Sequence, residues 1–480
     1  MDSRPSYYSR VSFRDLLDLA SERLGGSVIY ANDDFFAEKE NLIKPHAPVW
    51  KEHEYTDRGK WMDGWESRRK RVPGYDFAIL RLGARGVVRG VVVDTAFFRG
   101  NYPDSCSIDG SVDGETWSEL LPQSKLKGDS QNEFEVDQPF AVTHLRFNIF
   151  PDGGVARLRV HGNVVPEWRL VGGLGNNDLD LAAAENGAEV LTCSDMFFGP
   201  KHNLIMPGRA LNMSDGWETR RRRGPGHDWV IVQLATEGAV RRIEVDTNHF
   251  KGNYPDTASI EGSTDGKNWS ELLPRTKLEA HTRHFIIDEL TSAGPFTHLR
   301  LNVYPDGGVS RLRVWGRATE AGRRAAAVTR VNTLLDLGEL HRVCGSPRWV
   351  SEFAKARPFK SWDDMVEAAQ KIWMKLDERD WLEAFSAHPR IGERKAGWSQ
   401  QEQSGTRGAA EETMRALADE NRAYEEKFGF IYLVCATGRS ADEMLANCRE
   451  RMTNDRASEL RTAAEEQAKI IALRLEKLVL

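Results

Sequence analysis

Short apolar runs and polar turns alternate along the first two thirds of the chain. Segments such as VVRGVVVDT from Val87 and HLRLNVY from His298 are alternating or continuous apolar runs, and clusters of Gly, Pro, Asn and Asp separate them. Runs of this length, bounded by turn residues, are typical of strands in antiparallel sheets. This part of the chain is therefore predicted to be all-β, with its sheets packed as a sandwich or jelly roll.

The pattern changes after about residue 318, where apolar residues begin to recur every three or four positions. That spacing gives an α-helix one apolar face. Ser361 with Asp364 and Ser440 with Glu443 have the spacing of residues that cap a helix at its start. One apolar stripe in the last segment is formed by Leu460, Ala464, Gln467 or Ala468, Ile471, Leu475 and Leu478. An all-α helical bundle that ends in a long helix is expected.

The β part contains one domain twice. DTAFFRGNYPDSCSIDGSVDG at residues 94–114 returns as DTNHFKGNYPDTASIEGSTDG at residues 246–266, and matching blocks extend on both sides. A repeat of this length indicates a tandem duplication. The first copy has ten extra residues between positions 41 and 65, which are predicted to form a loop. The predicted boundaries are 1–168 for the first jelly-roll repeat, 169–318 for the second, 319–328 for a linker and 329–480 for the helical domain.

Composition narrows the function. The 480-residue chain has 66 Lys and Arg against 72 Asp and Glu, a net charge of −6, so no global positive field draws it to nucleic acid or to an anionic membrane. The N-terminus lacks a signal-peptide core, and no apolar run approaches the ~20 residues of a membrane span. Five widely spaced cysteines without a CxxC pair favour a reduced compartment. A soluble, cytoplasmic protein that binds neither nucleic acid nor membranes is expected, and whether it forms a homo-oligomer stays open.

Each copy carries a block of acids and arginines, DGWESRR from Asp63 and DGWETRR from Asp215. Arginine offers paired donors that fit a carboxylate or a ureido carbonyl, and an adjacent acid can transfer protons. A salt-bridge cluster at the surface or between the repeats would use the same residues. The block alone therefore leaves a substrate site and a structural ion-pair cluster open.

A second motif leaves a different function open. GSVDGETWSELL and GSTDGKNWSELL look like the hairpin of the galactose-binding-like jelly roll, with Asp-Gly at the turn. Many members of that fold are carbohydrate-binding modules. A non-catalytic tandem that binds a carbohydrate or a protein partner is therefore the alternative to an enzyme.

Taken together, the motifs DGWE-[ST]-RR, D-T-x-x-F-[RK]-G-N-Y-P-D, S-x-DG-x-x-W and [FY]-PDGG-[VI]-x-R resemble those of allantoicase, a family built from two such jelly rolls. The resemblance covers residues 10–318, in both copies. It implies hydrolysis of allantoate to ureidoglycolate and urea. That reaction requires an anchor for a carboxylate, donors to two ureido groups and an acid that protonates the departing nitrogen.

This chemistry selects candidate residues in the blocks and near them. The candidate carboxylate anchors are Arg68, Arg69, Arg220 and Arg221. The candidate acids, bases or metal ligands are Asp63, Glu66, Asp94, Asp215, Glu218 and Asp246. His249 is a further candidate for a site present in one copy only, because the other copy has Phe97 at that position. The spacing of a tightly held zinc ion does not occur, so a loosely bound divalent ion held by carboxylates is the metal option.

The helical part has its own candidate pair. His388 follows the helical segment DERDWLEAF, and Glu402 lies in SQQEQSG shortly after it. Histidine is the natural proton carrier near neutral pH, and a nearby glutamate can orient it. As a bare pair, the two residues favour a capping or surface role over a catalytic one.

The order of motifs changes that balance. CGSPRWVSEFAKARPF, HPRIG, SxxEQ, FGFIYLVCATGRS and KIIALRL resemble, in this order, the decarboxylase of 2-oxo-4-hydroxy-4-carboxy-5-ureidoimidazoline (OHCU). The resemblance spans about residues 329–480 and implies an all-helical enzyme that forms (S)-allantoin without a cofactor. By this resemblance His388 is the catalytic acid or base, with Glu402 beside it. The implied substrate-binding residues are Pro389, Ser399, Gln403, Val434, Cys435, Ala436, Thr437, Gly438 and Arg474. The chain is therefore expected to be a bifunctional enzyme of purine ureide breakdown.

Overall fold

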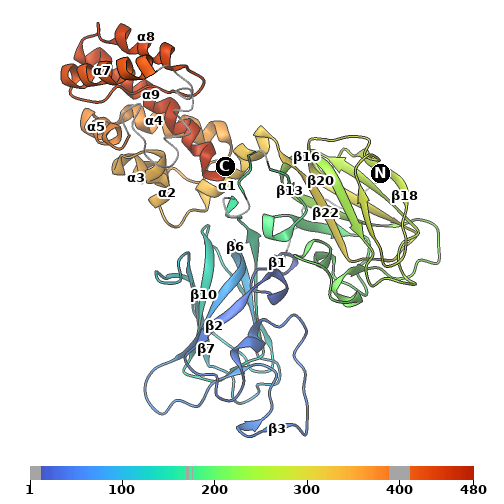
Figure 1. Cartoon of the computed structure of the whole chain (residues 1–480). Helices are drawn as coiled ribbons and strands as arrows, with labels where there is room; N and C mark the ends of the chain where they lie inside the picture. Colours follow the sequence, from blue (N-terminus) through green and yellow to red (C-terminus); the bar gives the residue numbers. More distant parts are fainter. Residues whose placement is uncertain (1–11, 169–171, 176, 389–410) are drawn as a thin grey trace, which may run out of the picture. The chain divides into compact units, whose positions relative to one another are not determined.

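The computed structural model describes residues 12–168, 172–175, 177–388 and 411–480. Backbone contacts divide it into two compact units, one up to residue 323 and one from residue 324 to the end. Figure 1 shows that the first unit contains two β-sheet repeats and that the second is helical. The predicted fold class, tandem antiparallel β repeats followed by an all-α part, is confirmed.

One long strand, β6, organises the first repeat. The strands are β1 (Leu17–Asp18), β2 (Ser27–Ala31), β3 (Tyr55–Thr56), β4 (Gly59–Lys60), β5 (Trp65–Glu66), β6 (Asp76–Asp94), β7 (Ser105–Ser111), β8 (Ser118–Lys125), β9 (Gln131–Glu135), β10 (Ala141–Phe150), β11 (Gly154–Val155) and β12 (Arg157–Val164). The first half of β6 pairs mainly with β2 and β10, and its second half pairs mainly with β9 and β12. Gly86 is required at the crossing to β12, because a Cβ there would lie 2.6 Å from the carbonyl oxygen of Asn163.

The second repeat has the same strand order. Its strands are β13 (Leu179–Asp180), β14 (Glu189–Cys193), β15 (Trp217–Glu218), β16 (Asp228–Asp246), β17 (Thr257–Ser263), β18 (Ser270–Lys277), β19 (Arg283–Ile286), β20 (Phe296–Tyr304), β21 (Gly308–Val309) and β22 (Arg311–Ala318). The order β13-β22-β16-β20-β17-β18 matches β1-β12-β6-β10-β7-β8 of the first repeat. The duplication seen in the sequence is therefore a duplication of topology.

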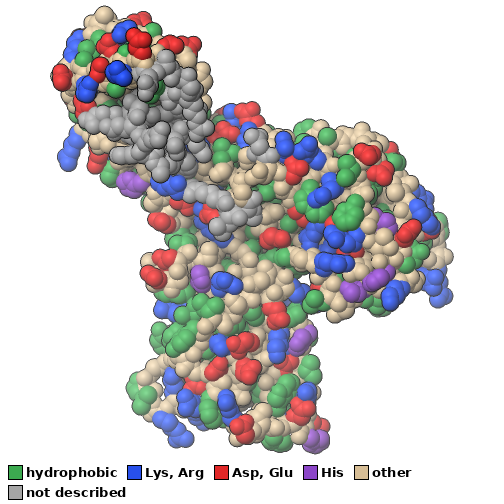
Figure 2. Space-filling model, in the orientation of Figure 1, with side chains coloured by type: hydrophobic (Ala, Val, Ile, Leu, Met, Phe, Trp, Pro, Cys, Tyr) green, Lys and Arg blue, Asp and Glu red, His purple; other side chains and the backbone are tan. Residues whose placement is uncertain are grey.

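Short elements complete the β unit. They are the 3-10 helices η1 (Phe13–Asp15), η2 (Glu22–Leu24), η3 (Lys39–Ile43), η5 (Ala184–Asn186), η6 (Lys201–Ile205) and η7 (Met213–Asp215). The ten-residue insertion, predicted as a loop, contains the two-residue ladder of β3 and β4. On the face shown in Figure 2, acidic and basic side chains are interspersed, as the small net charge leads one to expect.

The tryptophans of the DGWE blocks form part of the cores. Trp65 and Trp217 are fully buried, and each indole N–H donates to a backbone carbonyl, that of Asp33 at 2.8 Å and that of Asp195 at 2.9 Å. Burial of the apolar ring and satisfaction of its one donor are achieved together. This anchoring fixes the position of the acids on either side of each tryptophan.

The helical unit consists of consecutive α-helices. They are α1 (Glu320–Asn332), α2 (Gly338–Val343), α3 (Pro347–Lys355), α4 (Trp362–Lys375), α5 (Glu378–Ser386), α7 (Glu411–Phe428), α8 (Ala441–Arg451) and α9 (Arg456–Glu476), followed by η9 (Lys477–Val479). Residues 319–328, predicted as a linker, lie mostly in α1, because their Ala-rich sequence forms helix readily. Within the part of the chain that the structure describes, every helix is too short or too polar to cross a membrane.

Two details of the predicted helices are confirmed. Ser361 and Ser440 cap α4 and α8, and the Ser440 cap is a reciprocal capping box with Glu443. The predicted apolar stripe, which runs along α9 and ends in η9, is buried throughout. Trp373 of α4 packs on this helix and donates its indole N–H to the carbonyl of Ala464 at 2.8 Å.

Candidate functional site

The aspartates of the DGWE blocks are buried against arginines from a distant strand. Asp63 accepts hydrogen bonds from Arg157 Nη2 at 2.8 Å and from the backbone N of Val49 at 2.9 Å. Asp215 forms the equivalent bond with Arg311 Nη2 at 3.0 Å. Burial opposes ionisation of Asp63, but the bonds from Arg157 and Val49 outweigh it and lower its pKa. Each pair joins the block to the strand after the PDGG turn.

The arginines of the blocks lie elsewhere. Arg68 has an exposed side chain that pairs with Asp33 at 2.8 Å, and Arg220 pairs with Asp195 at 3.2 Å in the same way. Arg69 and Arg221 are exposed. The chain leaves the core after the buried tryptophan, so the arginines that follow point to solvent. The structure does not bring any of the four to Asp63, Asp215, Asp94 or Asp246.

The block glutamates contact the GNYPD loops. Asn101 Nδ2 donates to Glu66 at 2.7 Å, and Asn253 donates to Glu218. Burial raises the pKa of both carboxyl groups, although each amide bond opposes the rise. Two of the repeated motifs are thus joined in space in both copies.

A pocket of about 420 Å³ opens beside Asp94 at the end of β6. Its charged lining consists of Arg14, Arg23, Arg157, Arg159, Asp18 and Asp94. Asp94 Oδ1 accepts a hydrogen bond from the backbone N of Ala96 at 2.8 Å, and Oδ2 lies 3.3 Å from the amide Nε2 of Gln131. We refer to these residues as the Asp94 pocket.

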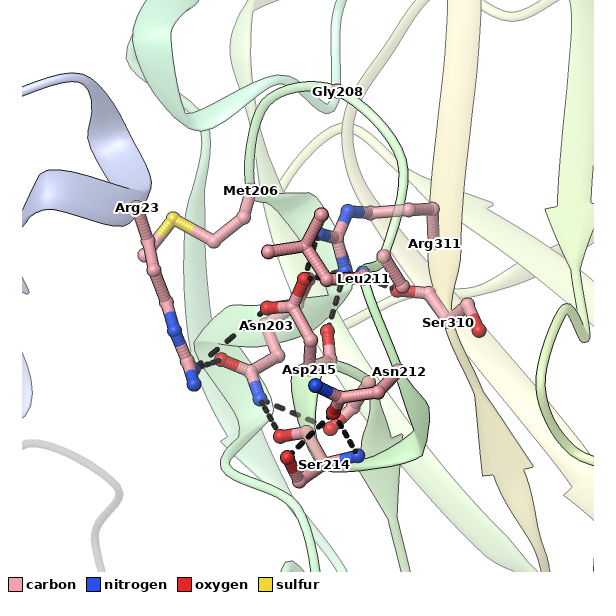
Figure 3. A network of polar contacts seen from close by, with 12 residues as sticks. Arg23, Asn203, Met206, Gly208, Leu211, Asn212, Ser214, Asp215, Ser310 and Arg311 are labelled. Carbon is pink, nitrogen blue, oxygen red and sulfur yellow. Dashed lines mark hydrogen bonds and ion pairs between the residues drawn. The ribbon is translucent and has the colours of Figure 1, made fainter. Parts of the chain in front are cut away.

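The second repeat completes this pocket. Asn203 and Met206 line it, and Arg23 Nη1 of the first repeat donates to Asn203 Oδ1 at 2.9 Å. The same nitrogen lies 3.8 Å from Asp215 Oδ1. Figure 3 shows Asp215 between Arg23 on one side and Arg311 on the other. Residues of both repeats therefore form the pocket.

The equivalent region of the second repeat contains different charged residues. It comprises Asp180, Glu185, Glu244, Asp246, Arg283, Arg311 and Arg313, which we call the Asp246 region. Glu185 replaces Arg23, and Glu244 replaces Val92. Arg283 is bound by Glu244. Burial raises the pKa of Asp180, Glu185 and Asp246.

His249 follows Asp246 by three residues and has a positive φ. Its backbone N donates to His281 Nδ1 at 2.7 Å, and its Nε2 lies 3.0 Å from the carbonyl oxygen of Ala210. Phe97 occupies the same conformation in the first repeat, where it packs on Trp50. Among the described residues, no group of three or more His, Cys, Asp or Glu side chains could hold a metal ion.

In the helical unit, His388 follows the end of α5. Its backbone N donates to the carbonyl of Phe385 at 3.0 Å. Arg474 of α9 is buried, and its Nη2 lies 3.4 Å from His388 Nδ1. The predicted residues Pro389, Ser399, Glu402 and Gln403 lie outside the described residues.

The predicted substrate loop between α7 and α8 is held by buried charges. The backbone N of Cys435 donates to Glu466 Oε2 at 2.6 Å, and Arg451 Nη1 donates to the carbonyl of Leu433 at 2.9 Å. Arg451 in turn pairs with buried Glu459 at 2.5 Å. Within the loop, Val434 and Ala436 are buried, whereas Thr437 and Gly438 are exposed.

Sequence reasoning missed the arginines that line the Asp94 pocket. Arg157 and Arg159 belong to the RLRV segment that both repeats share, so the repeat itself carried a signal for them. Arg14 and Arg23 have no arginine counterpart in the second repeat and gave no such signal. Their role follows only from the folded arrangement.

Comparison with known proteins assigns a family to each of the two parts of the chain. The family model described as allantoicase repeat matches residues 17–165 and 179–319, and the model for OHCU decarboxylase matches residues 337–476. Probable allantoicases from Pseudomonas fluorescens and Photobacterium profundum are 50% and 48% identical over 328 residues, which is 65% of this chain and 98% and 99% of theirs. The solved allantoicase of Saccharomyces cerevisiae is 37% identical over 62% of this chain and 92% of its own, with a TM-score of 0.55. The chain therefore belongs to the allantoicase family and continues into an OHCU decarboxylase domain.

Proposed function

We propose that the chain catalyses two reactions of ureide breakdown. The β unit hydrolyses allantoate to ureidoglycolate and urea, and the helical unit decarboxylates OHCU to (S)-allantoin. The alternative of a non-catalytic binding tandem finds no support in the comparisons. The observation that carries the hydrolase assignment is the Asp94 pocket, which combines arginines, a carboxylate and an amide in one cavity.

The composition of this pocket fits allantoate. The substrate is an anion with one carboxylate and two ureido groups, so it needs guanidinium donors for the carboxylate and both acceptors and donors for the ureido groups. Arg23 and Arg159 are the anchors we assign to the carboxylate. Asp94 and Gln131 offer oxygen and amide groups to the ureido nitrogens and carbonyls.

Hydrolysis forms a C–O bond from water to the central carbon and breaks the C–N bond to one ureido group. The proton that water loses must end on the departing urea nitrogen. Asp94 can accept that proton and deliver it to the departing nitrogen, because its carboxylate lines the pocket and its Oδ1 is held by the backbone N of Ala96. Asp63 has a different part, since it holds Arg157 in place rather than facing substrate.

The other predicted residues divide between support and the outer surface. Asp215, Glu66 and Glu218 fix loops around the blocks, and the exposed Arg68, Arg69, Arg220 and Arg221 lie outside the proposed pocket. His249 and Asp246 belong to the second repeat, where we assign no hydrolysis.

In the helical unit, loss of CO2 breaks the carbon–carbon bond to the carboxylate and leaves an electron pair that the conjugated ring takes up. One face of the resulting carbanion must then be protonated. His388 is the proton donor we assign, with the Arg474 guanidinium close enough to hold an anionic group beside it. Further backbone donors are assigned to the loop from Val434 to Gly438, apart from the N–H of Cys435, which is bound to Glu466.

One experiment separates the two activities within a single chain. Asp94→Asn should lower urea release from allantoate by about 100-fold or more and leave OHCU decarboxylation unchanged. His388→Ala should abolish enantioselective allantoin formation and leave urea release unchanged. Each activity serves as the concentration control for the other, and thermal unfolding checks that the mutated unit is folded. Urea release that survives Asp94→Asn but is lost in Asp246→Asn would move the hydrolase site to the second repeat.

A further inference from the structure

Gln467 differs from the other buried polar residues of α9. Its side chain is fully buried, and within the described residues neither Oε1 nor Nε2 has a hydrogen-bond partner. By contrast, Glu459 pairs with Arg451, and Glu466 accepts the bond from the backbone N of Cys435. Gln467 is therefore the exception on its own helix.

A primary amide buried in this way destabilises the fold. Both its donors and its acceptor lose their hydrogen bonds to water and gain none from the protein. Native structures contain few such groups, and each one calls for a physical explanation. Leu or Met would fill a similar volume at this position without the lost hydrogen bonds. A ligand that pairs with the amide would explain why the position holds Gln.

The geometry of α9 relates Gln467 to the predicted catalytic residues. Gln467 and Arg474 are seven residues apart, so they lie on the same side of the helix and about 10 Å apart along its axis. Helical side chains lean toward the helix N-terminus, so the long Arg474 side chain extends back in the direction of Gln467. His388 Nδ1 lies 3.4 Å from Arg474 Nη2. The amide, the guanidinium and the imidazole are thus arranged along one side of α9.

The chemistry of the amide points to its partner. A carboxamide presents one acceptor and two donors in a plane, and a ureido group presents the same kinds of atoms in a complementary plane. The OHCU substrate carries one ureido group and one carboxylate. We infer that Gln467 binds the ureido group of the decarboxylase substrate while Arg474 binds its carboxylate. This inference rests on the proposed decarboxylase function.

The test uses full-length protein with Gln467→Leu and Gln467→Met. Both variants should raise KM for OHCU by at least about tenfold, with a smaller effect on kcat, because a paired hydrogen bond in the bound state is lost. Their thermal unfolding midpoints should equal or exceed that of the wild type. Glu465→Gln, at an exposed position on the same helix, is the matched control and should change neither quantity.

A pair of inhibitors identifies the group that is bound. Allantoin carries a ureido group on a hydantoin ring, and hydantoin lacks it. Wild-type protein should bind allantoin more tightly than hydantoin in competition with OHCU, and both Gln467 variants should lose this preference. Unchanged KM and unchanged preference would overturn the inference, as would a marked fall in the unfolding midpoint of both variants, which would assign the amide a structural, water-bonded role. A wild-type chain without OHCU decarboxylation would overturn the proposed function as well.

Discussion

The two repeats keep the same buried ion pair but differ in the lining beside it. The bond from Arg157 to Asp63 in the first repeat is matched by the bond from Arg311 to Asp215 in the second. Beside them, the first repeat has Arg23 where the second has Glu185. Arginines pair with carboxylates of their own repeat in both linings, but the charge balance differs. The first lining has four arginines and two acids, whereas the second has three arginines and four acids. The two copies therefore share the buried Asp–Arg pair and differ in the charged residues beside it.

This difference also makes the copies dependent on each other. Arg23 extends from the first repeat to Asn203 of the second, which lines the pocket of the first (Figure 3). A small cavity formed at such a boundary is sensitive to any change that moves one repeat relative to the other. The second repeat therefore contributes to the proposed hydrolase site through its loop rather than through its own acids.

The largest effect should come from breaking the shared support. Asp63→Ala and Asp215→Ala each leave a buried arginine without its charge partner, and each should lower the free energy of unfolding by about 3 to 5 kcal/mol. Chemical denaturation followed by tryptophan fluorescence measures this. Asp104→Ala, which removes an exposed pair with Lys125, should change stability by less than about 1 kcal/mol. Equal effects at Asp63 and Asp104 would contradict the buried-support interpretation.

The repeated fold and the long helix were predictable from the sequence, but the partners of the buried aspartates were not. The repeat spacing revealed two copies of one fold, and the period of apolar residues located α9 and its stripe. Asp63, however, pairs with Arg157, which lies 94 residues away, and not with Arg68. Such a contact depends on how β5, β11 and β12 assemble, which local spacing does not encode. Neighbours in sequence were grouped as a site, although strand direction separates them in space.

In the helical unit, local spacing again did not reveal a contact between residues distant in sequence, but the family resemblance did. His388 and Arg474 lie 86 residues apart and meet at 3.4 Å, and only the family resemblance assigned both to one site. The periodicity of α9 placed Gln467 or Ala468 on the apolar stripe, but it did not indicate that the Gln467 amide would lack a hydrogen-bond partner among the described residues. Whether a buried polar residue is satisfied is a property of all its neighbours together, so it becomes visible only in the folded chain.

An intermediate effect should follow from making the first lining resemble the second. Arg23→Glu places in the first repeat the residue type that the second repeat has at the equivalent position, Glu185. It reverses the charge at position 23 and removes the bond to Asn203. KM for allantoate should rise by about 10-fold to 100-fold, because a guanidinium contact to an anion becomes a repulsion. Steady-state urea release measures this, with OHCU decarboxylation as the internal control. Arg68→Glu makes the same charge change at an exposed arginine and should leave KM unchanged; a rise equal to that of Arg23→Glu would restore the block arginines to the site.

The smallest effect concerns the acids of the second lining and appears as a pH dependence. Burial raises the pKa of Glu185 above its ordinary value of 4.5, and its Oε2 is buried without a hydrogen-bond partner among the described residues. The folded protein therefore binds this proton more tightly than the unfolded chain does. The ionised carboxylate destabilises the fold at pH values above its folded pKa, and this destabilisation disappears as the pH falls to the unfolded value.

Glu185→Gln should consequently be more stable than the wild type at pH 7 and should lose this advantage as the pH approaches 4.5. The quantity to measure is the difference in unfolding free energy between variant and wild type at each pH, because it cancels the other groups that titrate in the same range. Asp63, whose pKa is lowered, has the opposite sign, since its stabilisation persists at pH 7 and is lost on acidification. If the stability of Glu185→Gln relative to the wild type instead rises toward low pH, then Arg311 and Arg313 hold Glu185 ionised. The charges of the Asp246 region would in that case stabilise one another, which would contradict the prediction.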